Sequence, residues 1–301
     1  MNKRALSFVA FVILIASSTI FAANGAIAKP VVLIDDWQRS ITLDDQVPLR
    51  IVSLAPHATE LIVAAGLLKQ LVAVDTNSDF PPAVKTLPKL SSYPRIEIES
   101  VINQRPNLLV VWGAGLDRSL IDRLNNYGVA VFVSEPNLAA DIVRNIEQLA
   151  KLSTNPDDAR RLIANWQQRL KSLEAQYASK QKVSYFYQIS QQPLIAMSDQ
   201  SFQAEASRIC GGANIFAQGF SAAPQTDIEA IITQRPQVWL APTNRVLEAK
   251  NDEAALAHRD AIKTKGFKGI VLTLDDAQLQ RPGPRWLDGV ATFCAALDRV
   301  R

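Results

Sequence analysis

Few side chains in this 301-residue chain could do covalent or metal chemistry. The sequence has two histidines, His57 and His258, and two cysteines, all far apart. Ser53 or Asp79 could pair with His57, but such pairs arise by chance in a chain of this length. The sequence contains no nucleophile elbow, phosphate-binding loop, zinc-binding helix or dinucleotide-binding motif. We therefore expect neither a catalytic site nor a metal site.

A nine-residue pattern that occurs twice indicates binding to a partner and not catalysis. Residues 98–106 read IESVINQRP and residues 228–236 read IEAIITQRP, at a constant offset of 130. Each copy predicts a short amphipathic helix that proline stops and that leads into an apolar strand. Packing accounts for the apolar positions and the proline, but it does not require the shared Glu99 and Glu229. Two exposed carboxylates on two lobes suit a partner with two equivalent basic sockets.

The amino terminus has the composition of a secretory signal peptide. A basic start is followed by an apolar run over residues 5–16 and by the triplet Ala26-Ile27-Ala28. The run is too short to span about 30 Å of hydrocarbon. We expect cleavage after Ala28, with Ala22 and Ala23 as alternatives. No cysteine stands near the cut for a lipid anchor, so we expect a soluble, periplasmic protein.

The exported part contains both cysteines, Cys210 and Cys294. Exported proteins meet an oxidising compartment, in which paired thiols become disulfides. We therefore predict a disulfide bond between them; the alternative is two separate buried thiols.

Removal of residues 1–28 leaves 273 residues, enough for two lobes. The formal net charge of +3 then falls to about +1, because Lys3 and Arg4 are lost. Such a balanced charge gives no electrostatic footprint for nucleic acid or an anionic membrane surface. We expect a monomer whose partners are small or locally complementary.

Alternating strands and helices predict an α/β fold with two parallel-sheet lobes joined by one long helix, and a ligand cleft between the lobes. The expected boundaries are a signal peptide at 1–28, an N-terminal lobe at 29–152, an interlobe helix at 153–180 and a C-terminal lobe at 181–301. In the first lobe we expect strands at 50–54, 71–74, 108–112 and 129–133, with helices starting at Pro56 and at Leu116.

The interlobe helix is predicted by an apolar stripe spaced at four, four, three and four residues. Its members are Leu162, Trp166, Leu170, Leu173 and Tyr177. Asn155 could cap this helix, with Pro156 in its first turn. A helix of about 22 residues is about 33 Å long, enough to join two lobes.

Several segments together resemble the periplasmic cobalamin-binding proteins of ABC importers. They are residues 50–60, 78–82, 209–216, 279–281, 284–285 and 287–289, with the two glutamate-containing helices and Cys294. The resemblance covers nearly the whole exported chain. Heme and ferric-siderophore binding proteins of the same class share the first strand and helix and the duplicated glutamate. The Cys-Gly-Gly at 210–212 and the Gln-Arg at 280–281 favour cobalamin.

The resemblance implies roles for individual residues. Glu99 and Glu229 would dock onto the permease subunits of the importer, and the two cysteines would form the disulfide of the family. Cobalamin would be the transported ligand, with no catalytic cofactor, and would lie flat between the lobes. The predicted ligand-binding residues are Asn77, Phe80, Tyr93, Trp112, Gln188, Asp276, Ala277, Gln278, Leu279, Gln280 and Arg281. The chain departs from the pattern at 221–224 and 277–278, where several relatives carry an aromatic residue.

A corrinoid is a wide, nearly neutral disc fringed with amides, so its cleft needs aromatic faces and amide side chains. Two alternatives stay open within the class. His57 could ligate a heme iron, and Arg95, Arg281 and Arg285 could clamp a siderophore carboxylate. A secreted enzyme on this scaffold is the remote alternative.

Overall fold

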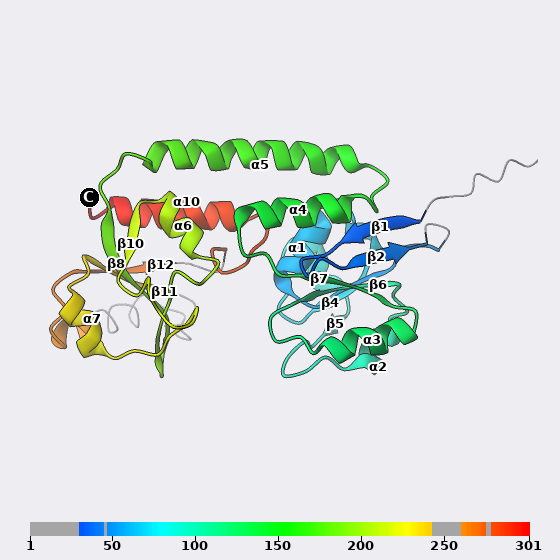
Figure 1. Cartoon of the computed structure of the whole chain (residues 1–301), viewed down its shortest axis with the longest axis horizontal. Helices are drawn as coiled ribbons and strands as arrows, with labels where there is room; N and C mark the ends of the chain where they lie inside the picture. Colours follow the sequence, from blue (N-terminus) through cyan, green and yellow to red (C-terminus); the bar gives the residue numbers. More distant parts are fainter. Residues whose placement is uncertain (1–29, 45–46, 243–259, 275–277) are drawn as a thin grey trace, which may run out of the picture.

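The computed structural model describes residues 30–44, 47–242, 260–274 and 278–301. The chain forms two α/β lobes side by side, and the long helix α5 (Pro156–Tyr177) runs across both of them (Figure 1). The predicted fold class is confirmed. Over the described ranges, no helix is both long and apolar enough to cross a membrane.

The N-terminal lobe is built on a five-stranded parallel sheet in the order β5-β4-β3-β6-β7. Its strands are β3 (Ile51–Ser53), β4 (Leu71–Asp75), β5 (Lys89–Leu90), β6 (Leu108–Trp112) and β7 (Ala130–Ser134). Its helices are α1 (Pro56–Ala64), α2 (Ile98–Ile102), α3 (Arg118–Asn126) and α4 (Ala139–Ala150), with 3-10 turns η1 (Leu68–Gln70) and η2 (Pro82–Thr86). Alternate residues of β6 are buried on opposite faces: Leu108 and Val110 pack with α1 and α4, and Leu109 and Val111 pack with α2 and α3. Helices therefore cover both faces, as a parallel sheet requires.

An antiparallel hairpin of β1 (Val31–Ile34) and β2 (Ser40–Leu43) precedes this sheet and was not predicted from the sequence. Two acidic side chains anchor it. Asp35 is fully buried and pairs with Arg39 at 2.5 Å, and Asp36 pairs with Arg144 of α4 at 2.6 Å. The hairpin is thus held to the lobe by the Asp36–Arg144 ion pair and by a hydrogen bond from the backbone N–H of Val133 to Asp35, and no local sequence pattern reveals these contacts.

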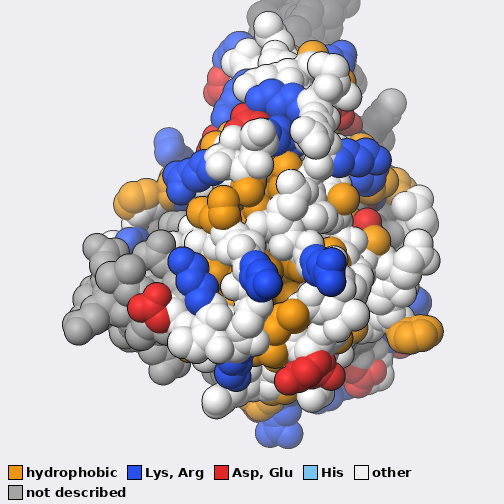
Figure 2. Space-filling model, turned by 90° about the vertical axis from the view of Figure 1, so that its left-hand side faces the viewer, with side chains coloured by type: hydrophobic (Ala, Val, Ile, Leu, Met, Phe, Trp, Pro, Cys, Tyr) orange, Lys and Arg blue, Asp and Glu red, His pale blue; other side chains and the backbone are white. Residues whose placement is uncertain are grey.

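The C-terminal lobe has a parallel sheet in the order β10-β8-β11-β12, with β9 antiparallel to β8. Its strands are β8 (Val183–Gln191), β9 (Leu194–Ala196), β10 (Gly212–Asn214), β11 (Val238–Pro242) and β12 (Ile270–Leu274); its helices are α6 (Ala204–Ile209), α7 (Ile228–Gln234) and α10 (Trp286–Asp298). Lys182, Arg235 and Lys268 lie exposed just before three neighbouring strands. Figure 2 shows Lys and Arg side chains spread over this end of the molecule. The carboxyl ends of the strands, where parallel lobes bind ligands, lie at the other edge of the sheet.

Helix α5 packs on α4 of the N-terminal lobe and on α6 and α10 of the C-terminal lobe, and it buries Ala159 and Ile163, which lie outside the predicted stripe, as well as part of the stripe. Trp166 and Tyr177 are buried, and the three leucines of the stripe are half-buried. The indole nitrogen Nε1 of Trp166 donates to the carbonyl oxygen of Pro284 at 2.9 Å. Asn155 stands at the N-cap, but its side chain donates to Asp158 instead of accepting from a helix amide, so the expected capping bond is wrong. Proline at the first helical position and the two aspartates that follow it mark this end instead.

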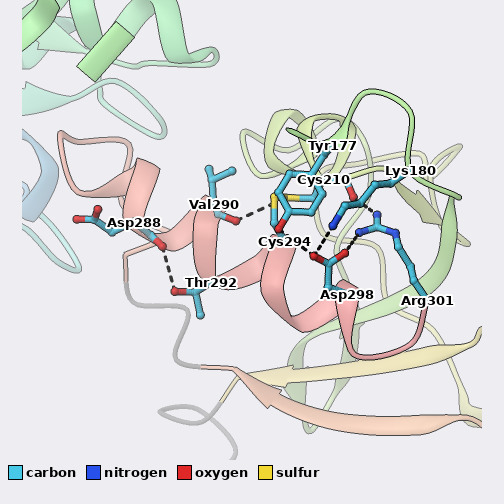
Figure 3. Close-up of a disulfide and its surroundings, with 9 residues drawn as sticks. All are labelled: Tyr177, Lys180, Cys210, Asp288, Val290, Thr292, Cys294, Asp298 and Arg301. Atoms are coloured by element: carbon cyan, nitrogen blue, oxygen red, sulfur yellow. Dashed lines mark hydrogen bonds and ion pairs between the residues drawn. A yellow bond between two sulfur atoms is a disulfide. The ribbon is translucent and has the colours of Figure 1, made fainter. Parts of the chain in front are cut away.

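The predicted disulfide is confirmed. Cys210 at the end of α6 and Cys294 within α10 are bonded, with their Cα atoms 4.7 Å apart (Figure 3). Beside it, Asp298 accepts from Tyr177 at 3.1 Å and from Lys180 at 2.7 Å. The bond and these contacts fix α10 against α6 and the end of α5.

Candidate functional site

The carboxyl end of β6 presents an aromatic face. Trp112 is the last residue of this strand and is 52% exposed, although the four residues before it are buried. Its ring meets the ring of His57 edge-on, with 6.3 Å between the centroids. The structure thus places Trp112 where an α/β lobe opens its ligand crevice.

His57 is buried and packs against the ring of Trp112. It lies in the first turn of α1, it is 5% exposed, and its Nε2 donates to the carbonyl oxygen of Ser134 at 3.3 Å. Burial lowers its pKa to about 4, against a smaller opposing effect of the bond to Ser134. The imidazole is therefore neutral at pH 7. Because Nε2 carries a proton, it has no lone pair for a metal ion.

The loop after β4 forms the neighbouring part of the surface. Asn77 and Phe80 are exposed, and Phe80 is 39% exposed. Between them, Ser78 is buried and shares a hydrogen bond of 2.8 Å with Thr59 of α1. The buried carboxylate of Asp75 accepts from the backbone N–H of Asn77 at 2.8 Å. These two hydrogen bonds fix the loop to the lobe, and Asn77 and Phe80 stay exposed.

The side chains of the possible catalytic pair lie in separate hydrogen-bond networks. Ser53 bonds with Ala55 and Thr59, Asp79 bonds with Arg281, and His57 bonds with Ser134. In the described part of the chain, no three His, Cys, Asp or Glu side chains are grouped closely enough to hold a metal ion.

The C-terminal lobe contributes the segment before α10. Asp276 and Ala277 lie outside the described residues, while Gln278 and Gln280 are half-buried. Leu279 is 1% exposed and packs in the core, directly against Gly289 of α10. Arg281 extends to the other lobe, where its Nη1 lies 2.6 Å from Oδ1 of Asp79. The structure thus places Arg281 between the lobes and Leu279 inside one of them.

The two remaining predicted ligand residues differ in their surroundings. Tyr93 is 85% exposed, in the segment between β5 and α2. Gln188 is fully buried in β8, where its Oε1 accepts from Nε1 of Trp239 at 2.8 Å. It lines a hollow of about 510 Å³ that Glu229 and Lys265 also line. The structure associates Gln188 with the surroundings of α7 and not with Trp112 or Phe80.

An ion pair that the sequence analysis missed joins the lobes. Glu60 of α1 is 4% exposed and receives two bonds from Arg285, at 2.5 Å from Nη2 and 3.0 Å from Nε. The bond to Glu60 raises the pKa of Arg285. Beside it, partial burial acts to raise the pKa of Asp79, but the bond and charge of Arg281 outweigh it and the pKa is lowered. A glutamate beside the apolar Leu61 and Ile62 was the only sequence signal.

The two copies of the nine-residue pattern, residues 98–106 and 228–236, fold in the same way. Glu99 and Glu229 both lie exposed in the first turn of their helices, α2 and α7. Each helix is followed by an arginine in the left-handed region, Arg105 with φ 51° and Arg235 with φ 49°, and then by proline. The expectation that both glutamates face solvent is confirmed.

Comparisons with known proteins agree with this architecture. The family described as periplasmic binding protein matches residues 51–267. A vitamin B12-binding protein of Vibrio campbellii is 34% identical over 258 residues, which cover 84% of this chain and 90% of the relative. The crystal structure of the periplasmic vitamin B12-binding protein of Vibrio cholerae has a TM-score of 0.71 at 35% identity and covers 83% of this chain and 97% of that one. A periplasmic heme-binding protein of Roseiflexus sp. RS-1 also has a TM-score of 0.71, over 85% of this chain and 100% of its own, but at 19% identity it shows the fold alone.

Proposed function

Because the chain belongs to the periplasmic binding protein family, we propose that it captures cobalamin or a related corrinoid between its lobes and delivers it to an ABC importer in the inner membrane. The observation that carries this proposal is the likeness to vitamin B12-binding proteins over more than four-fifths of the chain. The heme-binding neighbours share the fold at much lower identity, and so support the alternative less well.

The cleft chemistry supports a corrinoid. Phe80, which contacts Arg285 of the other lobe, and Trp112 at the carboxyl end of β6 offer exposed aromatic faces, and Asn77 offers an amide. Aromatic faces and a few amide groups match a broad disc with little net charge. His57 is a poor axial ligand for heme, since its Nε2 proton is bonded to Ser134 and its ring is buried.

The two helices that carry Glu99 and Glu229 supply the docking contacts in this proposal. They belong to different lobes, and both carboxylates are free to meet a partner in solvent. Each would pair with a basic socket on one of two permease subunits. Helix α5 would limit closure of the cleft to a small rocking motion, because it packs on both lobes.

The remaining parts of the proposal concern the exported form. Residues 1–28 would be removed as a signal peptide, and the released protein would act in the periplasm as a monomer without catalysis. Its relatives are named as binding proteins, and the matching family and the Vibrio cholerae structure are described as periplasmic.

Calorimetric titration with cyanocobalamin, hemin and a ferric siderophore tests the proposed ligand. We expect cyanocobalamin to bind with a stoichiometry of one and to outcompete the other two compounds. Binding of hemin alone, lost in the variant His57→Ala, would replace the proposal with a heme-binding role. Binding of the siderophore alone, lost in Arg281→Ala, would replace it with siderophore transport.

A further inference from the structure

The Glu60–Arg285 ion pair lies at the junction of the two lobes. Its partners are 225 residues apart in the sequence, one on α1 and the other immediately before α10. The loop before α10 reaches toward the N-terminal lobe (Figure 1). The guanidinium group grips the carboxylate with two nitrogens, the geometry that gives such pairs their strength and direction.

Burial separates this pair from an ordinary surface ion pair. The side chain of Glu60 is 3% exposed and that of Arg285 is 24% exposed. Arg169 and Asp288 form a pair of equal length, 2.5 Å, between α5 and α10, but their side chains are 56% and 46% exposed. Breaking a buried pair leaves an uncompensated charge, whereas an exposed partner is readily solvated. Replacing Glu60 or Arg285 should therefore have a larger effect than replacing Asp288.

The loop that presents Arg285 is held on both sides. The carbonyl oxygen of Pro284 accepts from Nε1 of Trp166 on α5 at 2.9 Å. Gly283 lies directly against Glu60, so that a methyl group at Gly283 would stand 3.3 Å from the carboxylate oxygen Oε2. The loop therefore contacts α5 through Pro284 and the N-terminal lobe through Gly283, and Arg285 is presented from between these two contacts.

The same arginine fixes an aromatic face of the cleft. The guanidinium carbon of Arg285 lies 3.9 Å from the centroid of the Phe80 ring, within the range of a cation–π contact. The residue before Phe80, Asp79, pairs with Arg281 of the other lobe. Two contacts from the C-terminal lobe therefore add to the hydrogen bonds that hold this loop within its own lobe.

We infer that Glu60 and Arg285 form a clasp between the lobes, which sets their spacing and the orientation of the Phe80 ring. They are positioning residues, since they act on the ligand through lobe spacing and through Phe80. The effect on lobe spacing is argued from the ion pair itself and needs no ligand, while the effect on a bound corrinoid rests on the proposed function.

Spin labels on the two lobes measure the spacing without any ligand. Cysteines introduced at the exposed Asn125 of α3 and Thr233 of α7 place one label on each lobe. We expect Glu60→Gln to broaden and lengthen the distance distribution, and the matched control Asp288→Asn to leave it unchanged. Should Glu60→Gln fail to fold, Arg285→Lys keeps the charge and removes only the two-nitrogen grip. A wild-type distribution in the folded clasp variant would overturn the clasp.

The rate of cyanocobalamin release measures the positioning role. We expect Glu60→Gln and Arg285→Met each to release it at least about tenfold faster than wild type, with Asp288→Asn close to wild type. The effects should be less than additive in the double variant, because both single variants lose the Glu60–Arg285 pair. Arg285→Met loses the Phe80 contact as well, and Glu60→Gln loses the longer pair of 3.9 Å with Arg281. Glu60→Asp should recover part of the effect. Wild-type release from both single variants, or additive effects in the double variant, would overturn the positioning role. If wild type does not bind cyanocobalamin, the proposed function fails, while the distances still decide the clasp.

Discussion

The two lobes share a parallel sheet and a duplicated helix, yet different chemistry stabilises their interiors. The C-terminal lobe contains the disulfide between Cys210 and Cys294. The N-terminal lobe contains no cysteine. It buries a neutral His57, which bonds to the carbonyl oxygen of Ser134. What the lobes keep in common at the surface is an exposed glutamate in the first turn of α2 and of α7. The comparison teaches that two interiors stabilised in different ways present the same surface feature, Glu99 and Glu229.

Removing both shared glutamates should have the largest effect. Each single variant, Glu99→Ala or Glu229→Ala, should weaken binding of the loaded protein to its importer about 30-fold or more, because each leaves one basic socket unpaired. The double variant should not bind measurably. Surface plasmon resonance on the reconstituted importer checks this, with Glu174→Ala on α5 as the control. The symmetry fails if one glutamate accounts for the whole effect, and docking through them fails if the double variant binds normally.

Removing the disulfide should affect one lobe only. Closing an 84-residue loop restricts the unfolded chain by up to about 4.5 kcal/mol, so Cys210→Ser/Cys294→Ser should lose stability of that order. Amide hydrogen exchange should show faster opening of β8 and α10, while β3 and β6 keep their protection. Equal loss of protection in both lobes would contradict the separate stabilisation of the two interiors.

Acid should act mainly on the N-terminal lobe. The pKa of His57 is about 4 in the folded protein against an ordinary value of 6.5, so the unfolded chain binds this proton first as the pH falls. The stabilisation is therefore complete above pH 6.5 and declines between pH 6.5 and 4, by up to about 3 kcal/mol. Urea unfolding of wild type and His57→Gln at pH 7 and pH 5 measures it. A loss equally large in the variant would assign the acid sensitivity to other groups.

The smallest expected effect distinguishes the starts of the two duplicated helices. Asp227 caps α7, since its Oδ1 accepts from the backbone N–H of Ala230 at 2.7 Å. The equivalent Glu97 before α2 makes no capping bond and pairs with Arg95 instead. In urea unfolding, Asp227→Ala should cost about 1 kcal/mol and Glu97→Ala less than about 0.5 kcal/mol. Equal costs would show that the caps do not differ.

The features that the sequence predicted depend on local patterns. The strand Leu108–Trp112 and the helix from Pro156 follow from an apolar run and from a periodic stripe. The disulfide follows from the compartment, and the exposure of Glu99 from its place opposite the buried side of a short helix. Each of these needs only neighbouring residues or chain-wide counts.

The features that the sequence missed depend on the third dimension. Glu60 and Arg285 meet only after both lobes have folded, so no spacing in the sequence predicts their ion pair. Gln188 was expected at the ligand, but its side chain is fully buried and accepts a hydrogen bond from Trp239 of the neighbouring β11, a contact that no alternation of residue types reveals. Leu279 likewise turns inward because Gly289 leaves room for its backbone.

The central claim is that the cleft beside Trp112 holds a corrinoid. The most direct test is the dissociation constant of cyanocobalamin for Trp112→Ala, measured beside Tyr127→Ala. Tyr127 is 64% exposed at the end of α3, and Trp112 is 52% exposed at the carboxyl end of β6, so the two variants remove exposed aromatic rings from different edges of one lobe. We predict that Trp112→Ala weakens binding about tenfold or more and that Tyr127→Ala leaves it unchanged. Equal binding by the two variants, or no binding of cyanocobalamin to the wild-type protein, would contradict the account.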